Sequence, residues 1–236
     1  MQLLRPSPDE LPDLAELYRT PPGPWLRLNF VSSLDGAGHV DGRSEPLSGP
    51  ADKRVFGILR MLCDALVVGA GTLREEGYHA LRLDAERRAW RVGHGMSEYP
   101  TLVVVSARCD LDPAHEALAD APVRPIIVTR AAAEPGPLTT VADIVVAGDE
   151  QVDLPAAVAL LHERGLRQIL SEGGPRLFGS LTAAGLVDEL CLTLSPLLAG
   201  PGAGRIIAGP PIDTPQALTL RHALLAEGLL LLRYSR

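Results

Sequence analysis

Short apolar runs alternate with helix-like segments through most of this chain. The stretch WLRLNFVSSLDG, residues 25–36, alternates apolar and polar positions as a strand does, and it ends in the turn-forming pair Asp35-Gly36. Residues 51–64 then carry apolar side chains at helical spacing, and the buried-strand run ALVVG follows directly. The order strand, helix, strand is typical of an α/β domain with a parallel sheet.

Further runs along the chain extend this pattern. Buried strands are expected at residues 101–106, 125–129, 143–147 and 167–171, with a helix at 154–164. The runs LVDELCLTLSP and ALTLRHALLAEGLLLLRY come last and are separated only by loop residues, so antiparallel strands are expected there. We therefore predict an α/β fold: a mixed, mostly parallel central sheet flanked by helices, with antiparallel C-terminal strands.

Two segments stand apart from this alternation. Residues 1–24 are predicted to be an N-terminal helical extension, because Leu11, Leu14 and Leu17 have helical spacing and the sequence PPGP then breaks the chain. Residues 25–236 form the main domain. Within that domain, residues 84–100 show no clear apolar period and are predicted to be a solvated, irregular excursion.

Composition narrows the class of protein. With 236 residues and 46% hydrophobic content, the chain can bury the core of one large domain. Its net charge of -7 and lack of a basic tract argue against nucleic acid or anionic membranes as partners. Three cysteines far apart, without a C-x-x-C pair, favour a reducing compartment without structural zinc. No apolar stretch approaches a membrane span and no signal-peptide pattern begins the chain, so a cytoplasmic protein is expected.

The sequence SEGGPRLFGSL, residues 171–181, places two glycines between an expected strand and an expected helix. Gly173 and Gly174 lack Cβ atoms, and Pro175 suits a first helical turn, so backbone N–H groups and a helix dipole would converge on one point. A pyrophosphate fits such a site. A glycine-rich turn selected for tight packing explains the pattern equally well.

A second stretch, VVGAGTLREEG at residues 67–77, repeats this arrangement. Gly69 and Gly71 follow a buried strand, and Thr72 supplies a hydroxyl donor or helix N-cap before the acidic pair Glu75-Glu76. The spacing matches neither G-x-G-x-x-G nor the Walker pattern. Two such turns in one domain indicate an extended ligand with several phosphates.

Polar side chains also follow two other strands. Ser106 and Arg108 end the run at 101–106, where a hydroxyl and a guanidinium suit the 2′-phosphate that distinguishes NADPH from NADH. Asn29, Ser33 and Asp35 lie at the end of the first strand, where open α/β sheets place ligand-contacting groups. A plain turn accounts for Asp35-Gly36 as well.

Four of these motifs together resemble a known family. NFVSSLDG, VVGAGTLREEGY, ILSEGGPRLFGSL and GLVDELCLTLSPLLAG, in this order and at these separations, are similar to the pyrimidine reductases of riboflavin biosynthesis, which have a dihydrofolate-reductase-like fold. The resemblance covers residues 25–234 and is greatest to free-standing actinobacterial members. It implies a cytoplasmic homodimer that uses NADPH to reduce a phosphoribosylamino-pyrimidine, of the 5-amino-6-(5-phosphoribosylamino)uracil type, to its ribitylamino form.

The resemblance also implies roles for individual residues. Asp35 and Glu172 would orient a ring amine or relay a proton. The expected substrate contacts are Asn29, Ser33, Ser44, Arg60 and Glu172. The expected cofactor contacts are Val31, Gly69, Gly71, Thr72, Glu76, Ser106, Arg108, Gly173, Gly174, Arg176, Leu177 and Phe178.

The chain departs from the family pattern in the substrate region. Bifunctional members carry Lys where this chain has Asn29, and the family's D-D-P-x-L-T segment reads EEGYHAL at residues 75–81. The zinc signature of a fused deaminase, H-x-E with P-C-x-x-C, is missing. Two alternatives therefore stay open: reduction of dihydrofolate or a related dihydropteridine, and a non-catalytic homologue that binds NADPH.

Overall fold

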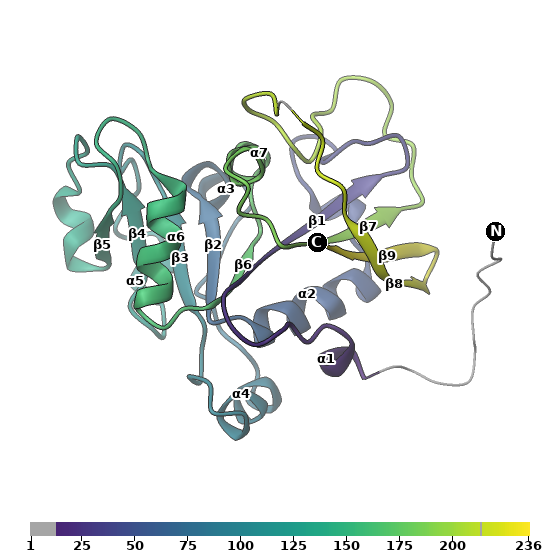
Figure 1. The fold of residues 1–236 in the computed structure, drawn as a ribbon, viewed down its shortest axis with the longest axis horizontal. Helices are drawn as coiled ribbons and strands as arrows, with labels where there is room; N and C mark the ends of the chain where they lie inside the picture. The colour runs from purple at the N-terminus through teal and green to yellow at the C-terminus, as the bar shows by residue number, and fades with distance from the viewer. Residues whose placement is uncertain (1–12, 213) are drawn as a thin grey trace.

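A single mixed sheet organises the chain (Figure 1). The computed structural model describes residues 13–212 and 214–236. The strand order is β5-β4-β3-β2-β6-β1-β7-β9-β8; neighbours are parallel from β5 through β7, and β9 is antiparallel to both β7 and β8. This confirms the predicted fold class. The strands are β1 (Trp25–Ser33), β2 (Ala65–Gly69), β3 (Thr101–Val105), β4 (Ile126–Thr129), β5 (Asp143–Val146), β6 (Gln168–Ser171), β7 (Glu189–Ser195), β8 (Thr219–Ala226) and β9 (Leu229–Ser235).

Helices cover both faces of the sheet and divide the core in two. One face packs against α2 (Pro50–Leu62), α3 (Ala70–Glu75), α5 (Glu116–Ala119) and the short α1 (Leu14–Leu17). The other face packs against α6 (Leu154–Glu163) and α7 (Pro175–Ala183). Strands in the middle of the sheet are buried on both sides, which explains their continuous apolar runs. Two 3-10 helices, η1 (Glu45–Leu47) and η2 (Gly136–Thr140), lie in the connections.

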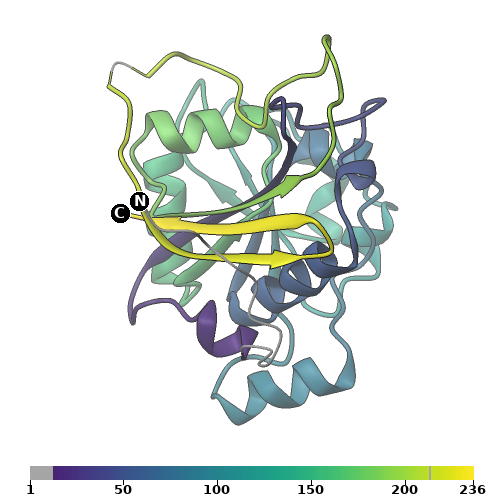
Figure 2. The ribbon, with the colours of Figure 1, turned by 90° about the vertical axis from the view of Figure 1, so that its right-hand side faces the viewer.

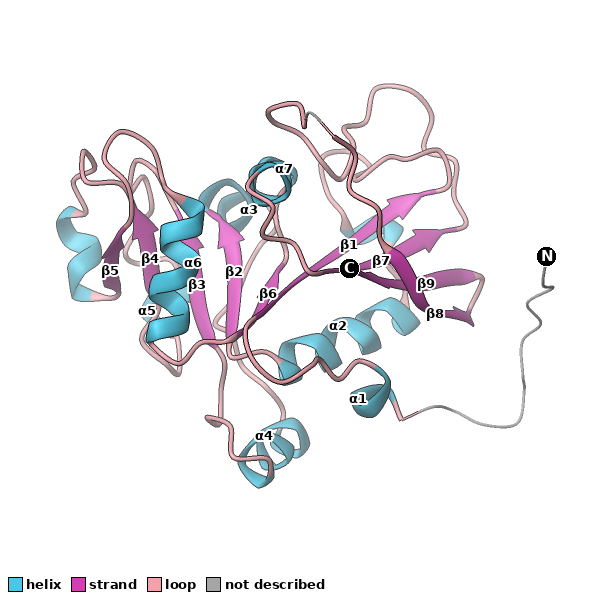
Figure 3. Cartoon of the chain, in the orientation of Figure 1, coloured by secondary structure: helices cyan, strands magenta, loops and turns pink. Residues whose placement is uncertain are grey.

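Strand β6 lies between β1 and β2, although it follows them by about a hundred residues. Its last residue, Ser171, pairs with Leu28 of β1 and with Val67 of β2. Because the three strands are parallel, their carboxyl ends meet at one edge, where the loops gather (Figure 3). The segments that begin at Asn29, Gly69 and Glu172 are thereby brought together.

The prediction for residues 84–100 was wrong, because the segment contains helix α4 (Ala85–Gly93). Asp84 caps this helix by accepting a hydrogen bond from Arg87 N. Its buried side chain is Arg91, which donates to the carbonyls of Met61, Cys63 and Ser97. An apolar period is absent because the helix is anchored through an arginine that satisfies backbone carbonyls.

The part of the N-terminal extension that the structure describes is attached to the core through Tyr18. Tyr18 is buried, and its ring meets His222 of β8 edge to face at 4.8 Å. Arg27 donates to Tyr18 O at 2.6 Å, and Arg233 donates to Leu17 O at 2.6 Å. The predicted helical position Leu11 lies outside the described residues.

The last two strands form a hairpin that carries the chain to its end (Figure 2). Side chains of β9 alternate, because Leu229 and Leu231 are buried, whereas Leu230 is exposed. At this end of the sheet the edge strand is β8, and β9 is paired on both sides. Within the described residues, no helix is long and apolar enough to cross a membrane.

Candidate active site

The two glycine turns predicted from the sequence touch each other. Gly69 N donates to Gly173 O at 2.6 Å. A Cβ on Gly174 would lie 2.6 Å from Thr72 Oγ1, and one on Gly173, where φ is +78°, would lie 2.3 Å from the ring of Phe30. The peptide between Gly173 and Gly174 is cis. The turn therefore has no room for a side chain at either glycine; Gly173 is buried, whereas Gly174 lines the sheet edge with backbone alone.

Each glycine turn opens a helix. Helix α7 starts at Pro175 with Gly174 as N-cap, so no side chain takes up its first N–H groups. Helix α3 likewise has Gly69 as its N-cap. The predicted N-cap role of Thr72 was wrong: Thr72 lies inside the first turn of α3, and its hydroxyl faces Gly174. The free N–H groups of α7 suit a bound anion.

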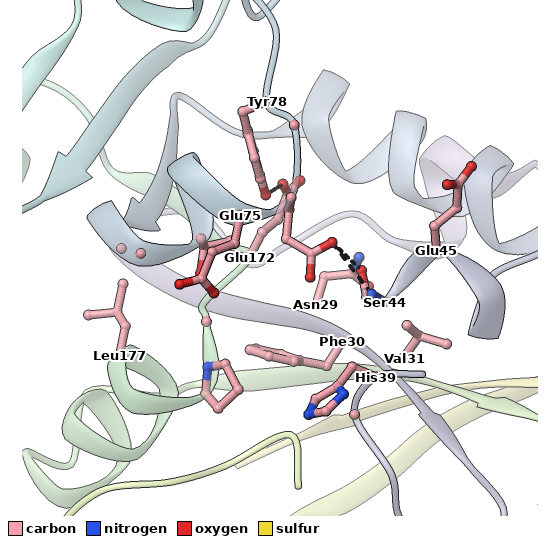
Figure 4. Close-up of a pocket in the computed structure, with 18 of the residues that line it drawn as sticks. Asn29, Phe30, Val31, His39, Ser44, Glu45, Glu75, Tyr78, Glu172 and Leu177 are labelled. Atoms are coloured by element: carbon pink, nitrogen blue, oxygen red, sulfur yellow. Dashed lines mark hydrogen bonds between the residues drawn. The ribbon is translucent and has the colours of Figure 1, made fainter. Parts of the chain in front are cut away.

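A pocket of about 1330 Å³ opens at this edge of the sheet (Figure 4). Single small ligands usually occupy pockets of about 300–1,000 Å³, so this space can take a dinucleotide and a substrate together. Most of the predicted site residues line it: Asn29, Val31, Ser44, Arg60, Gly69, Gly71, Thr72, Glu76, Glu172, Gly174, Arg176 and Leu177.

Glu172, directly after β6, is a buried carboxylate of the pocket. Arg60 of α2 grips it with two hydrogen bonds, Nε to Oε1 at 2.8 Å and Nη2 to Oε2 at 2.7 Å. Tyr78 donates its hydroxyl to Oε2 at 2.5 Å. Burial alone would lower the pKa of Arg60, but the facing carboxylate outweighs it and raises that pKa. Burial, reinforced by Glu172, raises the pKa of Tyr78 well above its ordinary value, so the phenol remains a donor.

A second polar contact in the pocket joins a predicted substrate residue, Ser44, to a predicted cofactor residue, Glu76. The Ser44 hydroxyl donates to Glu76 Oε2 at 3.0 Å, as the dashed line beside Ser44 shows (Figure 4). Ser44 was predicted to contact substrate, whereas Glu76 was predicted to contact the cofactor. Their hydrogen bond joins the loop after β1 to the end of α3.

Asp35 is not among the pocket-lining residues that the structure describes. Its carboxylate accepts hydrogen bonds from Ser33 Oγ, from Ala199 N at 3.1 Å and from Gly200 N at 2.8 Å. The Ser33 hydroxyl and these two amides lower the pKa of Asp35 to about 2. These contacts tie the loop after β1 to the loop after β7, and neither Asp35 nor Ser33 is among the residues that line the pocket.

Four predicted cofactor residues also lie outside the lining in the described part of the chain. Gly173 and Phe178 are buried beneath it, where Phe178 packs against Phe30 with 4.8 Å between ring centroids. Ser106 and Arg108 follow β3, one strand beyond β2, and so lie further along the same sheet edge. Arg108 is exposed and has no hydrogen-bond or ion-pair partner among the described residues.

Three aromatic side chains that line the pocket were missed from the sequence: Phe30 of β1, Phe56 and Tyr78. Tyr78 lies in the segment EEGYHAL, which departs from the family pattern, and Phe56 lies on α2 one turn before Arg60. The Arg60 guanidinium stands 4.0 Å from the centroid of the Phe56 ring and 5.6 Å from that of Tyr78. Phe56 could have been found by its helical spacing to Arg60. No cluster able to hold a metal ion occurs in the described ranges.

Comparison with known proteins follows this geometry. The family model described as RibD C-terminal domain matches residues 24–231. The 2,5-diamino-6-ribosylamino-4(3H)-pyrimidinone 5′-phosphate reductase of Archaeoglobus fulgidus is 33% identical over 180 residues, covering 75% of this chain and 82% of that protein. The reductase of the same name from Methanothermobacter thermautotrophicus is 31% identical, covering 80% and 86%.

A solved structure agrees with the fold over nearly the whole chain. The pyrimidine reductase-like protein of Corynebacterium diphtheriae superposes with a TM-score of 0.81 at 27% identity, covering 95% of this chain and 94% of that one. The RibD protein of Acinetobacter baumannii has a TM-score of 0.73 at 20% identity, and this chain spans only 58% of it.

Proposed function

We propose a function on the premise that this chain belongs to the RibD C-terminal domain family. Relatives that are named reductases match it over most of its length, so the chain is an oxidoreductase of riboflavin biosynthesis. The proposed reaction is the NADPH-dependent reduction of a phosphoribosylamino-pyrimidine to its ribitylamino form. The observation that carries this proposal is the junction of the two glycine turns beside the buried Glu172–Arg60 pair, within a single pocket.

NADPH supplies a hydride when it is bound. The lack of a side chain at Gly69 and Gly174 and the free N–H groups of α7 fit a pyrophosphate, and Arg176 at the start of that helix adds a positive charge. Ser106 and Arg108 are proposed to hold the 2′-phosphate. The chain's own task is then alignment, because hydride chemistry belongs to the cofactor.

The substrate is proposed to lie against Asn29, Ser44, Arg60 and Glu172. Arg60 and Glu172 present donors and an acceptor side by side, which suits the N–H and carbonyl groups of a pyrimidine. The resemblance of the sequence motifs implies the uracil form of the substrate, whereas the two archaeal relatives are named for the 2,5-diamino form. Both forms therefore belong in the test.

The test is steady-state NADPH oxidation with each pyrimidine and with dihydrofolate, run beside a calorimetric titration of NADPH. Turnover of either pyrimidine, with dihydrofolate inert, supports the proposal and identifies the preferred form. Turnover of dihydrofolate alone would replace it with the pteridine alternative. NADPH binding without turnover of any substrate would instead identify a non-catalytic homologue.

The chain is also proposed to form a homodimer through the outer face of β7, β8 and β9. Register places Leu194 beside Leu230 and Leu230 beside Leu225, and in the next row Leu192 lies beside Leu232. Leu225 and Leu230 are 50% and 38% exposed, and neither belongs to the two core clusters of the described chain. A two-fold contact between identical faces is the commonest way to bury such a surface.

A further inference from the structure

Tyr78 lies in the segment where this chain departs from the family pattern, and its hydroxyl contacts a single carboxylate of the pocket, that of Glu172. The residue follows Gly77, whose φ of +64° turns the chain after α3 back towards the sheet. The phenol then reaches the carboxylate of Glu172, and Figure 4 shows the two side chains end to end. The departure in sequence therefore delivers a hydroxyl to the carboxylate assigned to the substrate.

The hydrogen bonds at Glu172 are unequal between its two oxygens. Oε2 accepts from both Arg60 Nη2 and Tyr78, whereas Oε1 accepts only from Arg60 Nε. A carboxylate oxygen offers about two acceptor positions. Among the described residues, Oε2 is therefore saturated and Oε1 keeps one position for a donor from outside the protein.

The surrounding side chains fix this arrangement. The Glu172 side chain is 3% exposed and that of Arg60 is 23% exposed, so the pair is largely shielded from water, and both residues line the pocket. The Arg60 guanidinium lies over the rings of Phe56 and Tyr78, which limits its rotation. The free lone pair of Glu172 Oε1 therefore has a fixed direction in addition to the negative charge of the carboxylate.

We propose that Tyr78 is a positioning residue which blocks Oε2 and leaves Glu172 a single acceptor, Oε1, for one N–H of the substrate's pyrimidine ring. This inference rests on the proposed function. A blocked Oε2 admits one orientation of the ring. With Oε2 open, a second orientation or a water molecule competes for the carboxylate, and the sugar is presented out of line with the cofactor.

The experiment compares wild type with Tyr78→Phe, which keeps the ring and removes the hydroxyl. Hydrogen bonds to charged groups contribute enough for about a tenfold effect, so kcat/KM for the pyrimidine is expected to fall about tenfold. KM for NADPH is expected to stay within about twofold, because the Tyr78 hydroxyl contacts Glu172 and none of the groups proposed to hold the cofactor. Tyr99→Phe, which removes a phenol that lies beside Arg88 of α4 and does not line the pocket, is the matched control.

A double-mutant cycle with Glu172→Gln separates positioning from a structural role. If Tyr78 acts through Glu172, adding Tyr78→Phe to Glu172→Gln lowers kcat/KM by less than about twofold further. Three results would each overturn the inference while leaving the reductase function intact. They are additive losses of kcat/KM in the double mutant, equal changes in KM for the pyrimidine and for NADPH, and a Tyr78→Phe enzyme indistinguishable from wild type. A wild-type protein that neither turns over nor binds a pyrimidine would overturn the proposed function itself, and the inference with it.

Discussion

Gly174 and Gly173 are neighbours with different tasks, and single substitutions separate them. An added Cβ at Gly174 meets the hydroxyl of Thr72 at the pocket wall, so Gly174→Ala is expected to weaken NADPH binding at least about tenfold, near 1.4 kcal/mol. An added Cβ at Gly173 meets the ring of Phe30, which packs against Phe178, so Gly173→Ala is expected to cost about 1–3 kcal/mol of folding stability. Calorimetric titration and urea unfolding measure the two effects.

Gly93 provides the control for both variants, because a Cβ there meets nothing within 4 Å. Gly93→Ala in α4 is expected to leave NADPH affinity unchanged and to stabilise the helix by up to about 1 kcal/mol. If Gly174→Ala instead lowered the melting temperature while retaining normal affinity, the turn would be a packing element and not a phosphate site.

Arg108 is expected to confer preference for NADPH over NADH. Its exposed guanidinium follows β3 at the sheet edge, where it is free to pair with a 2′-phosphate. Arg108→Gln should weaken NADPH binding about tenfold and leave NADH binding unchanged, since NADH lacks that phosphate. Titration of both cofactors against both proteins gives the result, and equal losses for the two cofactors would contradict the assignment.

His222 is expected to make folding stability depend on pH. Burial, assisted by the nearby Arg233 and Arg27 and opposed by Glu189, lowers the pKa of His222 to about 4, while the Tyr18 ring packs against it. Its unfolded pKa is about 6.5, so between these values the unfolded chain binds more protons. The contribution of His222 is complete above pH 6.5 and is lost as pH falls towards 4.

Urea unfolding at pH 7 and pH 5 tests this. Wild type should lose stability between the two values, and His222→Gln should lose less. His94→Gln, at the exposed end of α4, should behave like wild type. An unchanged pH dependence in His222→Gln would show that other groups are responsible.

Which site residues can be predicted from sequence depends on how far apart their partners lie. Gly69 and Gly174 are recognisable because a strand, a glycine and a helix follow one another locally. Tyr78 is not, because its partner Glu172 is 94 residues away and only the fold brings them together. Asp35 shows the opposite case: its place at a strand end suggested chemistry, but its carboxylate caps the backbone of a loop 164 residues away.

At the scale of elements, α1 is stabilised by the packing of Tyr18 at its C-terminal end and not by its own hydrogen bonds. It has four residues, too few for an isolated helix, and Tyr18 anchors it in the core. Tyr18→Ala is expected to cost about 3–5 kcal/mol of folding stability, as buried aromatic truncations do. Urea unfolding measures the loss, with Tyr99→Ala as a less buried control; equal losses would argue against the anchoring role.

Strands were predicted more reliably than irregularly patterned helices. The strands at 65–69 and 101–105 are buried on both faces, so nearly all of their residues are apolar and the sequence shows them as continuous apolar runs. Helix α4 carries no such signal, because Arg91 satisfies carbonyls of the neighbouring segments instead of filling an apolar gap. Its cap residue Asp84 was the available clue.

At the scale of the whole molecule, the outer face of β7, β8 and β9 is expected to bind a second copy of the chain. Light scattering is expected to give twice the chain mass of 25.1 kDa, and Leu230→Asp with Leu232→Asp is expected to give a folded monomer. The control is Val92→Asp with Val146→Asp, which charges two exposed apolar positions elsewhere. A wild-type monomer at micromolar concentration would refute the dimer.

Strand order was the part of the whole molecule that local patterns left open. Runs of similar composition can be arranged in many orders, and nothing in residues 167–171 states that this strand enters between β1 and β2. The parallel direction was predictable because helices separate the strands. The order emerges only from pairing across distant parts of the chain.

The insertion of β6 has a consequence during synthesis. A nascent chain that has emerged only as far as β5 carries β1 and β2 without the strand that joins them, so each exposes an unpaired edge. The ribosome must add about a hundred residues beyond β2 before β6 is available, several seconds or more at about 5–20 residues per second. During that interval the β1 and β2 edges are open to mispairing and to chaperones, and the pocket's ability to bind its ligands begins only when β6 closes the gap.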